Sequence, residues 1–222
     1  IEKAKACGVA FVAVRGSNHF GMAAYFTRMA LPHDMIGMCC TSPAAHLLAP
    51  TGGIEPILDN NPFSFAIPAG KEYPVVLDMA TSVVSRGKLA AAAKRRDKIP
   101  LTWAMTIDGH PTDDPQLGFD GILLPVGGYK GYGLTVISGV MAAMLSNAAL
   151  LSRDVCDFYV DTDRAQNIDH LFGCIDIRAF CDVEDFKRRM DEMIEEIHSC
   201  KKAPGVEQIL LPGERSGRAA DR

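Results

Sequence analysis

The sequence predicts an α/β fold in which a mixed, mostly antiparallel sheet is wrapped by helices. Apolar runs with the length and β-branched content of strands recur along the chain. Segments of helical period lie between them without the strict alternation that parallel βαβ units require. Hydrophobic residues make up 48% of the 222 residues, so the chain can bury a core of this kind.

The first part of the chain is predicted to form helix, strand, helix and strand. Residues 1–6 have the pattern of the last turns of a helix, and the apolar run 9–14 predicts a buried strand. A loop over residues 15–21 leads to a helix at about residues 22–31. Residues 36–40 then predict a second, short strand.

The middle of the chain adds further strands and a helix. Residues 63–67 alternate cleanly between apolar and small or polar side chains, which predicts a strand with one polar face. Residues 75–77 predict a strand that ends on Asp78. Strong helix formers fill most of 83–95, so we expect a helix there, and residues 99–106 are strand-like.

A glycine loop at residues 125–133 runs directly into an apolar stretch of helical length at 134–150. Such a junction presents unpaired backbone N–H groups and the positive end of the helix dipole, which favours a bound phosphate. Lys130 adds a positive charge at the same place. The local pattern leaves an alternative open: a plain turn with a solvated lysine, because neither the P-loop nor the Rossmann spacing is present.

The stretch 134–150 lacks an aromatic belt and contains Thr135, Ser138, Gly139, Ser146 and Asn147. We therefore expect a buried central helix rather than a membrane span. Residues 171–177 predict a strand, and Asp182 can cap the helix that follows. A last strand is expected at 206–211, and the tail from Ser216 to Arg222 is predicted to be disordered.

Composition and charge exclude several classes of ligand and site. The net charge of −4 and the lack of a basic stretch with aromatic residues argue against nucleic acid. Seven cysteines without a Cys-x-x-Cys pair argue against a disulfide framework or a zinc site, and they favour a reducing, cytoplasmic compartment. No two histidines share a helix at i, i+4, so we expect no metal. The expected partner is a small molecule.

Two titratable residues lie at strand ends, where a side chain can be held firmly and still reach a ligand. His19 follows the first strand, and its imidazole could act as a general acid or base. Asp78 could cap the next helix, hold a ribose hydroxyl or line an active site. A structural histidine and a capping aspartate are the alternatives that spacing alone leaves open.

Several segments, taken in order, carry a resemblance. They are Gly16-Ser17-Asn18-His19-Phe20-Gly21, Ala49-Pro50-Thr51-Gly52-Gly53, Asn60-Asn61-Pro62, Leu77-Asp78-Met79-Ala80-Thr81-Ser82, Gly128-Tyr129-Lys130-Gly131-Tyr132-Gly133 and Leu211-Pro212-Gly213-Glu214. Their ordered combination resembles the malate/L-lactate dehydrogenase family of the non-Rossmann type, whose relatives include ureidoglycolate and sulfolactate dehydrogenases, diketogulonate reductase and a cyclic imino acid reductase.

The resemblance implies an NAD(P)-dependent oxidoreductase that transfers a hydride between nicotinamide and a small 2-hydroxy or 2-oxo acid. It also implies a non-Rossmann NAD(P)-binding fold and a homodimer. His19 matches the catalytic histidine, which exchanges a proton with the substrate. Positions that match cofactor contacts are Thr41, Ser42, Asp78, Met79, Ala80, Lys130, Gly213, Glu214 and Arg215. Gln166, Asn167 and His170 fall in a segment that approaches the substrate.

The same resemblance implies a division of the chain. Residues 1–50 would belong to a substrate and dimerisation domain, 51–175 to the cofactor-binding domain, and 176–222 would return to the first. Family members carry further residues before Ile1 and after Arg222, including an arginine for the substrate carboxylate. Asp59 stands where the family usually has glycine.

Three questions stay open at this stage. The chain could be a catalytically incomplete fragment that binds nucleotide or dimerises. It could also be a pyridoxal-phosphate enzyme with Lys130 as the Schiff-base lysine. The choice between NAD and NADP is likewise open, because the basic residues that could meet a 2′-phosphate also fit a solvated helix face. Those residues are Arg86, Lys94, Arg95 and Arg96.

Overall fold

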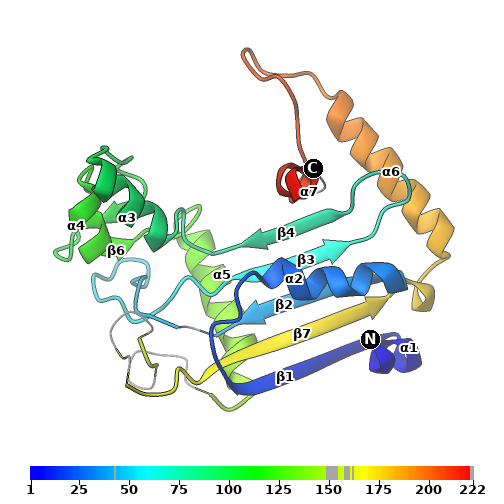
Figure 1. Ribbon diagram of the computed structural model, residues 1–222, viewed down its shortest axis with the longest axis horizontal. Coiled ribbons are helices and arrows are strands. Elements are labelled where there is room, and N and C mark those ends of the chain that lie inside the picture. Colours follow the sequence, from blue (N-terminus) through cyan, green and yellow to red (C-terminus); the bar gives the residue numbers. More distant parts are fainter. Residues whose placement is uncertain (43, 149–154, 158–160, 162, 221–222) are drawn as a thin grey trace.

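A computed structural model describes residues 1–42, 44–148, 155–157, 161 and 163–220. Its main feature is a five-stranded sheet in the order β1-β7-β2-β3-β4 (Figure 1). The strands are β1 (Val9–Ser17), β2 (Met35–Thr41), β3 (Phe63–Ile67), β4 (Val75–Met79) and β7 (Ile168–Asp176). Every neighbouring pair in this sheet is antiparallel, which confirms the predicted fold class.

Two helices cover opposite faces of the sheet. On one face, α2 (Ala23–Thr27) continues as a 3₁₀ turn over Arg28–His33. Gly37 of β2 faces this side, because a Cβ there would lie 2.1 Å from the carbonyl oxygen of Thr27. On the other face lies α5 (Tyr129–Gly139), which ends in a π-helical turn over Val140–Met144 (Figure 1).

A small unit lies beside the sheet, next to the start of α5 (Figure 1). It contains α3 (Arg86–Arg95), β5 (Ala104–Met105), α4 (Pro115–Asp120) and β6 (Ile122–Leu123). The side chains of Ser85 and Asp114 cap the two helices. The largest described hydrophobic cluster lies here, and it includes Leu48, Leu58, Leu89, Ile99, Ala104 and Leu123.

The remaining helices are α1 (Glu2–Cys7), α6 (Val183–Ser199) and α7 (Glu214–Ala220), together with a 3₁₀ turn over Ile177–Ala179. Asp182 caps α6 by accepting the backbone N–H of Asp185, as predicted. Asp191 of α6 accepts the backbone N–H groups of residues 70–72, which ties the helix to the turn between β3 and β4.

Several expectations about single elements are wrong. The strand at 9–14 is mostly exposed, because β1 is an edge strand whose apolar side chains include Phe11 at 46% exposure. No strand forms at 206–211. The tail is not disordered from Ser216, since α7 runs to Ala220; residues 221–222 lie outside the described part. The strand-like run 99–106 forms strand only at Ala104–Met105.

The stretch at 134–150 also departs from expectation. It is helical as far as Met144, but it is not buried all round: Ile137 is 59% exposed, and Leu145, just after the helix, is 66% exposed. Residues 149–150 fall outside the described part. None of the described helices has the length and hydropathy needed to cross a bilayer. The five strands β1 to β4 and β7 share one sheet. The division into domains at residues 50 and 175 stays a prediction.

Candidate active site

The loop that carries His19 is held by three side chains from the segment that enters β7. Gln166 accepts the backbone N–H of His19 through Oε1 at 2.8 Å. Asp169 accepts the N–H of Gly16 through Oδ1 at 2.7 Å, and Nε2 of His170 donates to the carbonyl oxygen of Asn18 at 3.2 Å. Because these bonds hold consecutive parts of one short loop, the position of the His19 backbone is well defined.

The His19 ring itself is exposed and points one nitrogen back at its own loop. The backbone N–H of Gly21 donates to Nδ1 at 3.2 Å. A nitrogen that accepts this bond carries no proton, so the neutral ring carries its proton on Nε2. In this tautomer Nε2–H is a hydrogen-bond donor, and Nε2 can pass its proton to a ligand once Nδ1 is protonated as well.

His19 lines a small cavity. The strand end at Thr41 and Ser42 and the segment at Asp59 and Asn60 line it as well. The described lining consists of His19, Phe20, Gly21, Thr41, Ser42, Ala44, Asp59, Asn60, Pro62 and Ile168. Thr41 and Ser42 were predicted near the cofactor, and the structure places both beside His19. Their hydroxyls are engaged within the protein, since Ser42 Oγ accepts the N–H of Asp169 at 2.8 Å.

His170 is buried behind this cavity and does not line it. Its Nδ1 lies 2.8 Å from the hydroxyl of Thr41, and its ring centroid lies 4.2 Å from that of Phe20. Burial lowers the pKa of His170, which favours the neutral ring. The predicted substrate contact of Gln166, Asn167 and His170 stays a prediction; what the structure shows for Gln166 and His170 is support of the His19 loop.

Asp78 lies at the end of β4 and caps a helix, although not the one that follows it. Its Oδ2 accepts the backbone N–H of Ala24 in the first turn of α2 at 2.7 Å. This bond joins β4 to the helix just after the His19 loop. Met79 and Ala80 continue from the same strand end, so the three predicted cofactor positions lie close to the start of α2.

Thr81 connects the His19 cavity to the glycine loop, and sequence reasoning did not single it out for this role. Its N–H and hydroxyl both donate to the carbonyl oxygen of Asn60, at 2.8 Å each. Its hydroxyl also lies 2.5 Å from that of Thr135 on α5, and its own carbonyl accepts the N–H of Val126 at 2.8 Å. Thr81 is fully buried, so it fixes the cavity wall against the start of α5.

The start of α5 has the features expected of an anion site. Gly127 and Gly128 have φ values of 63° and 64°, which only glycine adopts without strain. Gly128 is the N-cap residue, and no side chain in the described part of the chain caps the helix there. The first-turn N–H groups are thus left to water or a ligand, and Lys130 is exposed in that same turn.

The predicted cofactor positions near the C-terminus, residues 213–215, follow a segment that pairs with the edge strand β4. Pro212 accepts the N–H of Val76 in β4, and a Cβ on Gly213 would lie 2.4 Å from the carbonyl oxygen of Val76. Glu214 is buried and accepts bonds from His198 at 3.0 Å, from the N–H of Leu211 at 3.0 Å and from Arg218. Arg215 is exposed. A cofactor contact at these positions stays a prediction. The described bonds of Glu214 connect parts of the protein to one another.

Replacing Glu214 with Gln should destabilise the protein by about 1–3 kcal/mol at pH 7, because His198 and Arg218 lose a charged partner. Burial acts to raise the pKa of Glu214, but the bonds from His198 and Leu211 outweigh it and the pKa is lowered. The carboxylate therefore stabilises the fold above the unfolded value of 4.5, and this contribution is lost as the pH falls through the lowered pKa. Urea unfolding at pH 7 and near pH 3 measures both effects, with exposed Glu195→Gln as the control.

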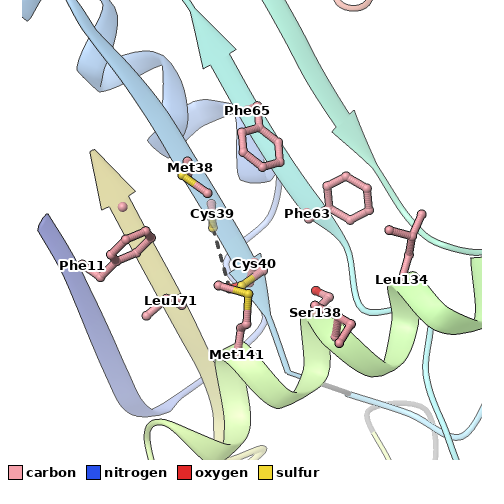
Figure 2. A pocket seen from close by; sticks show the side chains of 12 residues that line it. Phe11, Met38, Cys39, Cys40, Phe63, Phe65, Leu134, Ser138, Met141 and Leu171 are labelled. Atoms are coloured by element: carbon pink, nitrogen blue, oxygen red, sulfur yellow. Dashed lines mark hydrogen bonds between the residues drawn. The ribbon is translucent and has the colours of Figure 1, made fainter. Parts of the chain in front are cut away.

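A second, apolar cavity of about 170 Å³ lies between the sheet and α5. Figure 2 shows Phe11, Phe63, Phe65 and Met141 among the side chains around it. Burial raises the pKa of Cys39 to about 12 and that of Cys40 to about 11, so neither thiol is activated. This cavity offers packing surface rather than chemistry. Among the residues described, no three His, Cys, Asp or Glu side chains are grouped to hold a metal ion.

Fold and site together define a class of α/β protein. Its central sheet is antiparallel throughout, and the buried Thr81 links the wall of the His19 cavity at Asn60 to α5 and to the glycine loop before it. A family model for malate/L-lactate dehydrogenase matches residues 1–222, and the chain belongs to that family.

Individual relatives agree with this assignment. The malate/(S)-sulfolactate dehydrogenase of Methanothermus fervidus is 42% identical over 217 residues, which is 97% of this chain and 61% of that protein. The solved sulfolactate dehydrogenase of Methanocaldococcus jannaschii superposes with a TM-score of 0.89 at 39% identity, covering 98% of this chain and 61% of the other. The ureidoglycolate dehydrogenase (NAD(+)) of Escherichia coli K12 is 33% identical over 96% of this chain and 60% of that protein. The chain thus spans about three-fifths of the length of these relatives.

Proposed function

We propose that this chain carries the proton-transfer and cofactor-binding parts of an NAD(P)-dependent oxidoreductase acting on a small 2-hydroxy or 2-oxo acid. The observation that carries the proposal is the link through Thr81 between the His19 cavity and the uncapped start of α5. An acid–base group and an anion site thereby share one rigid framework. The names of the relatives, which are malate and sulfolactate dehydrogenases, support the substrate class.

The roles follow from the groups at each end of this framework. The first-turn N–H groups of α5 and Lys130 would hold a phosphate of the dinucleotide. The nicotinamide supplies the hydride when bound. His19 exchanges a proton with the substrate oxygen through Nε2. To donate a proton from Nε2, the ring must also be protonated at Nδ1. Nδ1 then no longer accepts the N–H of Gly21 and instead donates to an acceptor such as water.

The test combines turnover with binding. Oxidation of NADH or NADPH in the presence of pyruvate, oxaloacetate or a related 2-oxo acid would support the proposal. Calorimetric titration of both cofactors separates it from a fragment that binds nucleotide without turnover. A visible absorption band that borohydride discharges would instead favour the pyridoxal-phosphate alternative at Lys130. Absence of both cofactor binding and turnover would contradict the proposal.

Replacing Lys130 with Gln should raise the Kd of the reduced cofactor about tenfold, which corresponds to the loss of one charge-assisted contact of roughly 1.4 kcal/mol. The effect should shrink at high salt because screening weakens the lysine contact in the wild type. Fluorescence titration at low and high ionic strength measures it. Lys98→Gln serves as the matched control, since Lys98 pairs with Asp113 on the exposed surface of the small unit. Equal Kd values for wild type and Lys130→Gln would remove Lys130 from the site.

The proposal extends to the type of cofactor, the oligomeric state and the cellular compartment. Relatives whose names carry NAD(+) and NADP(+) both occur, so we propose a nicotinamide dinucleotide without choosing between them. We propose a homodimer, supported by the exposed apolar side chains Leu134, Ile137 and Met144 on α5 and its π turn. Seven free cysteines support the expectation of a reducing, cytoplasmic location.

A further inference from the structure

Asp59 is a buried carboxyl group in the wall of the His19 cavity. It is 5% exposed and follows Leu58, which pairs with Leu48. Its Oδ2 accepts the N–H groups of Ala44 at 2.8 Å and Ala45 at 3.0 Å, and its Oδ1 accepts the N–H of Asn60 at 2.7 Å. The side chain therefore has one fixed orientation.

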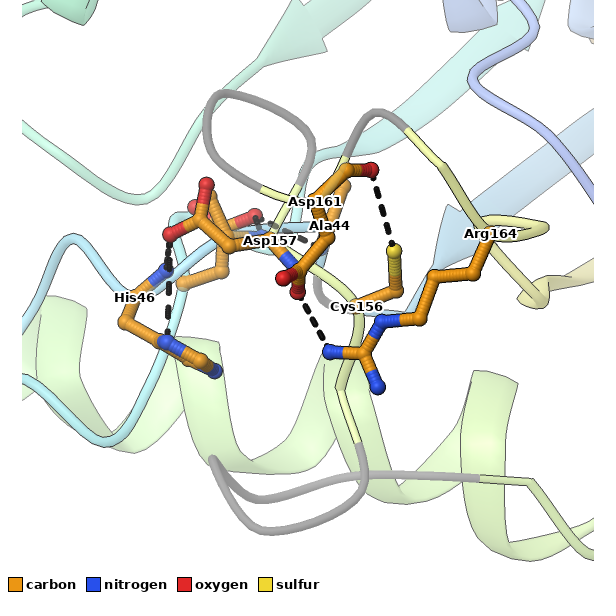
Figure 3. A network of polar contacts seen from close by, with 8 residues as sticks. Ala44, His46, Cys156, Asp157, Asp161 and Arg164 are labelled. Carbon is orange, nitrogen blue, oxygen red and sulfur yellow. Dashed lines mark hydrogen bonds and ion pairs between the residues drawn. The ribbon is translucent and has the colours of Figure 1, made fainter.

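The charge of Asp59 is solvated by backbone dipoles, and its described bonds bring no positive side chain to it. Burial raises the pKa of Asp59 above its usual value, the three backbone N–H bonds act to lower it and favour the ionised form, and the nearby Asp157 acts in the same direction as burial. Figure 3 shows Asp157 close to Ala44 in a network with His46 and Asp161. No lysine or arginine belongs to the described lining of the cavity, so an ionised Asp59 makes the wall beside His19 negative.

Asp59 also retains acceptor capacity. A carboxylate oxygen can accept two hydrogen bonds, and Oδ1 accepts one, from Asn60. A hydrogen-bond donor on a ligand in the cavity could supply the second. An anionic group at the same place would face repulsion from an ionised Asp59.

We propose that Asp59 sets the charge selectivity of this cavity. It favours a 2-oxo or 2-hydroxy acid whose remaining group is an uncharged or cationic hydrogen-bond donor, and it disfavours one with a second anionic group. Malate and sulfolactate, which give the relatives their names, both carry such a second anionic group. This inference rests on the proposed function, and it assigns the present chain a different substrate preference within the same reaction class.

The test uses two probes of nearly the same shape. Oxalate carries two carboxylates, whereas oxamate replaces one of them with an amide that can donate hydrogen bonds. Calorimetric titration of each into the full chain with NADH or NADPH present should give oxamate at least tenfold tighter binding. Asp59→Asn should reduce this preference at least fivefold, and Asp59→Gly should do the same without an amide in the wall.

Asp157→Asn is the matched control, because it removes the same charge from a neighbouring carboxylate that is not among the lining residues; the oxamate preference should persist. Thermal unfolding of each variant checks the fold. Equal affinity for the two probes in the wild type, no detectable binding of either, or a preference unchanged in both folded Asp59 variants would overturn the inference. Because selectivity is measured without turnover, a failure of cofactor oxidation would count against the proposed function alone.

Discussion

Replacing His19 with alanine is expected to lower turnover with a 2-oxo acid by about 10²- to 10⁴-fold, the range typical of a lost general acid or base. The Kd of the cofactor should change less than about twofold, because the proposed phosphate site at α5 lies at the other end of the framework. The His19 side chain is exposed, so the fold should tolerate the change. Stopped-flow or steady-state absorbance at 340 nm, with cofactor titration, measures both quantities.

His33→Ala provides the matched comparison. His33 is also exposed and lies at the end of the 3₁₀ turn after α2, and it is not part of the described cavity lining. Turnover in that variant should stay within about twofold of the wild type. A His19→Ala protein that keeps wild-type turnover would show that another group moves the proton. A large loss of cofactor affinity would instead give His19 a binding role.

The sequence allowed the strands to be predicted where local pattern and structure agree. Residues 63–67 alternate strictly, and β3 spans the same residues, paired with β2 on one side and β4 on the other. Its small face, Ser64 and Ala66, is the fully buried one. β5 and β6 contain two residues each, too few to show any period. The exposure of β1 and α5 could not be predicted either, because it depends on which surfaces the rest of the fold leaves uncovered rather than on hydropathy.

Some residues of the candidate site can be singled out in the sequence, and others only in the folded structure. The sequence singles out His19 and Lys130 as candidates because each lies at a recognisable junction, a strand end or a glycine loop before a helix; their roles stay proposals. The support of His19 by Gln166 could not be predicted, since 147 residues separate them in the sequence. Asp59 attracted attention only as a departure from the family pattern, and its place in the cavity wall emerged from the fold. The linking role of Thr81 could not be predicted either, because its hydrogen-bond partner Thr135 is 54 residues away in the sequence.

Gly131→Ala is expected to have the second large effect, and it tests the glycine loop directly. A Cβ at Gly131 would lie 2.1 Å from the carbonyl oxygen of Val126, and backbone cannot move aside as a side chain can. The loop must therefore shift, at a cost of about 1–3 kcal/mol in the free energy of unfolding. Because Val126 is bonded to Thr81, the shift should also disturb the anion site and raise the cofactor Kd at least tenfold.

Gly133→Ala makes the same substitution two residues further along α5, where nothing lies within 4 Å of the added Cβ. There alanine should stabilise the helix by about 0.5–1 kcal/mol and leave the cofactor Kd unchanged. Urea unfolding and cofactor titration of the two variants separate a requirement for close backbone approach from a general effect of glycine in the helix. If both variants bind cofactor like the wild type, the tight contact between α5 and Val126 does not shape the binding site, and the phosphate must be held elsewhere.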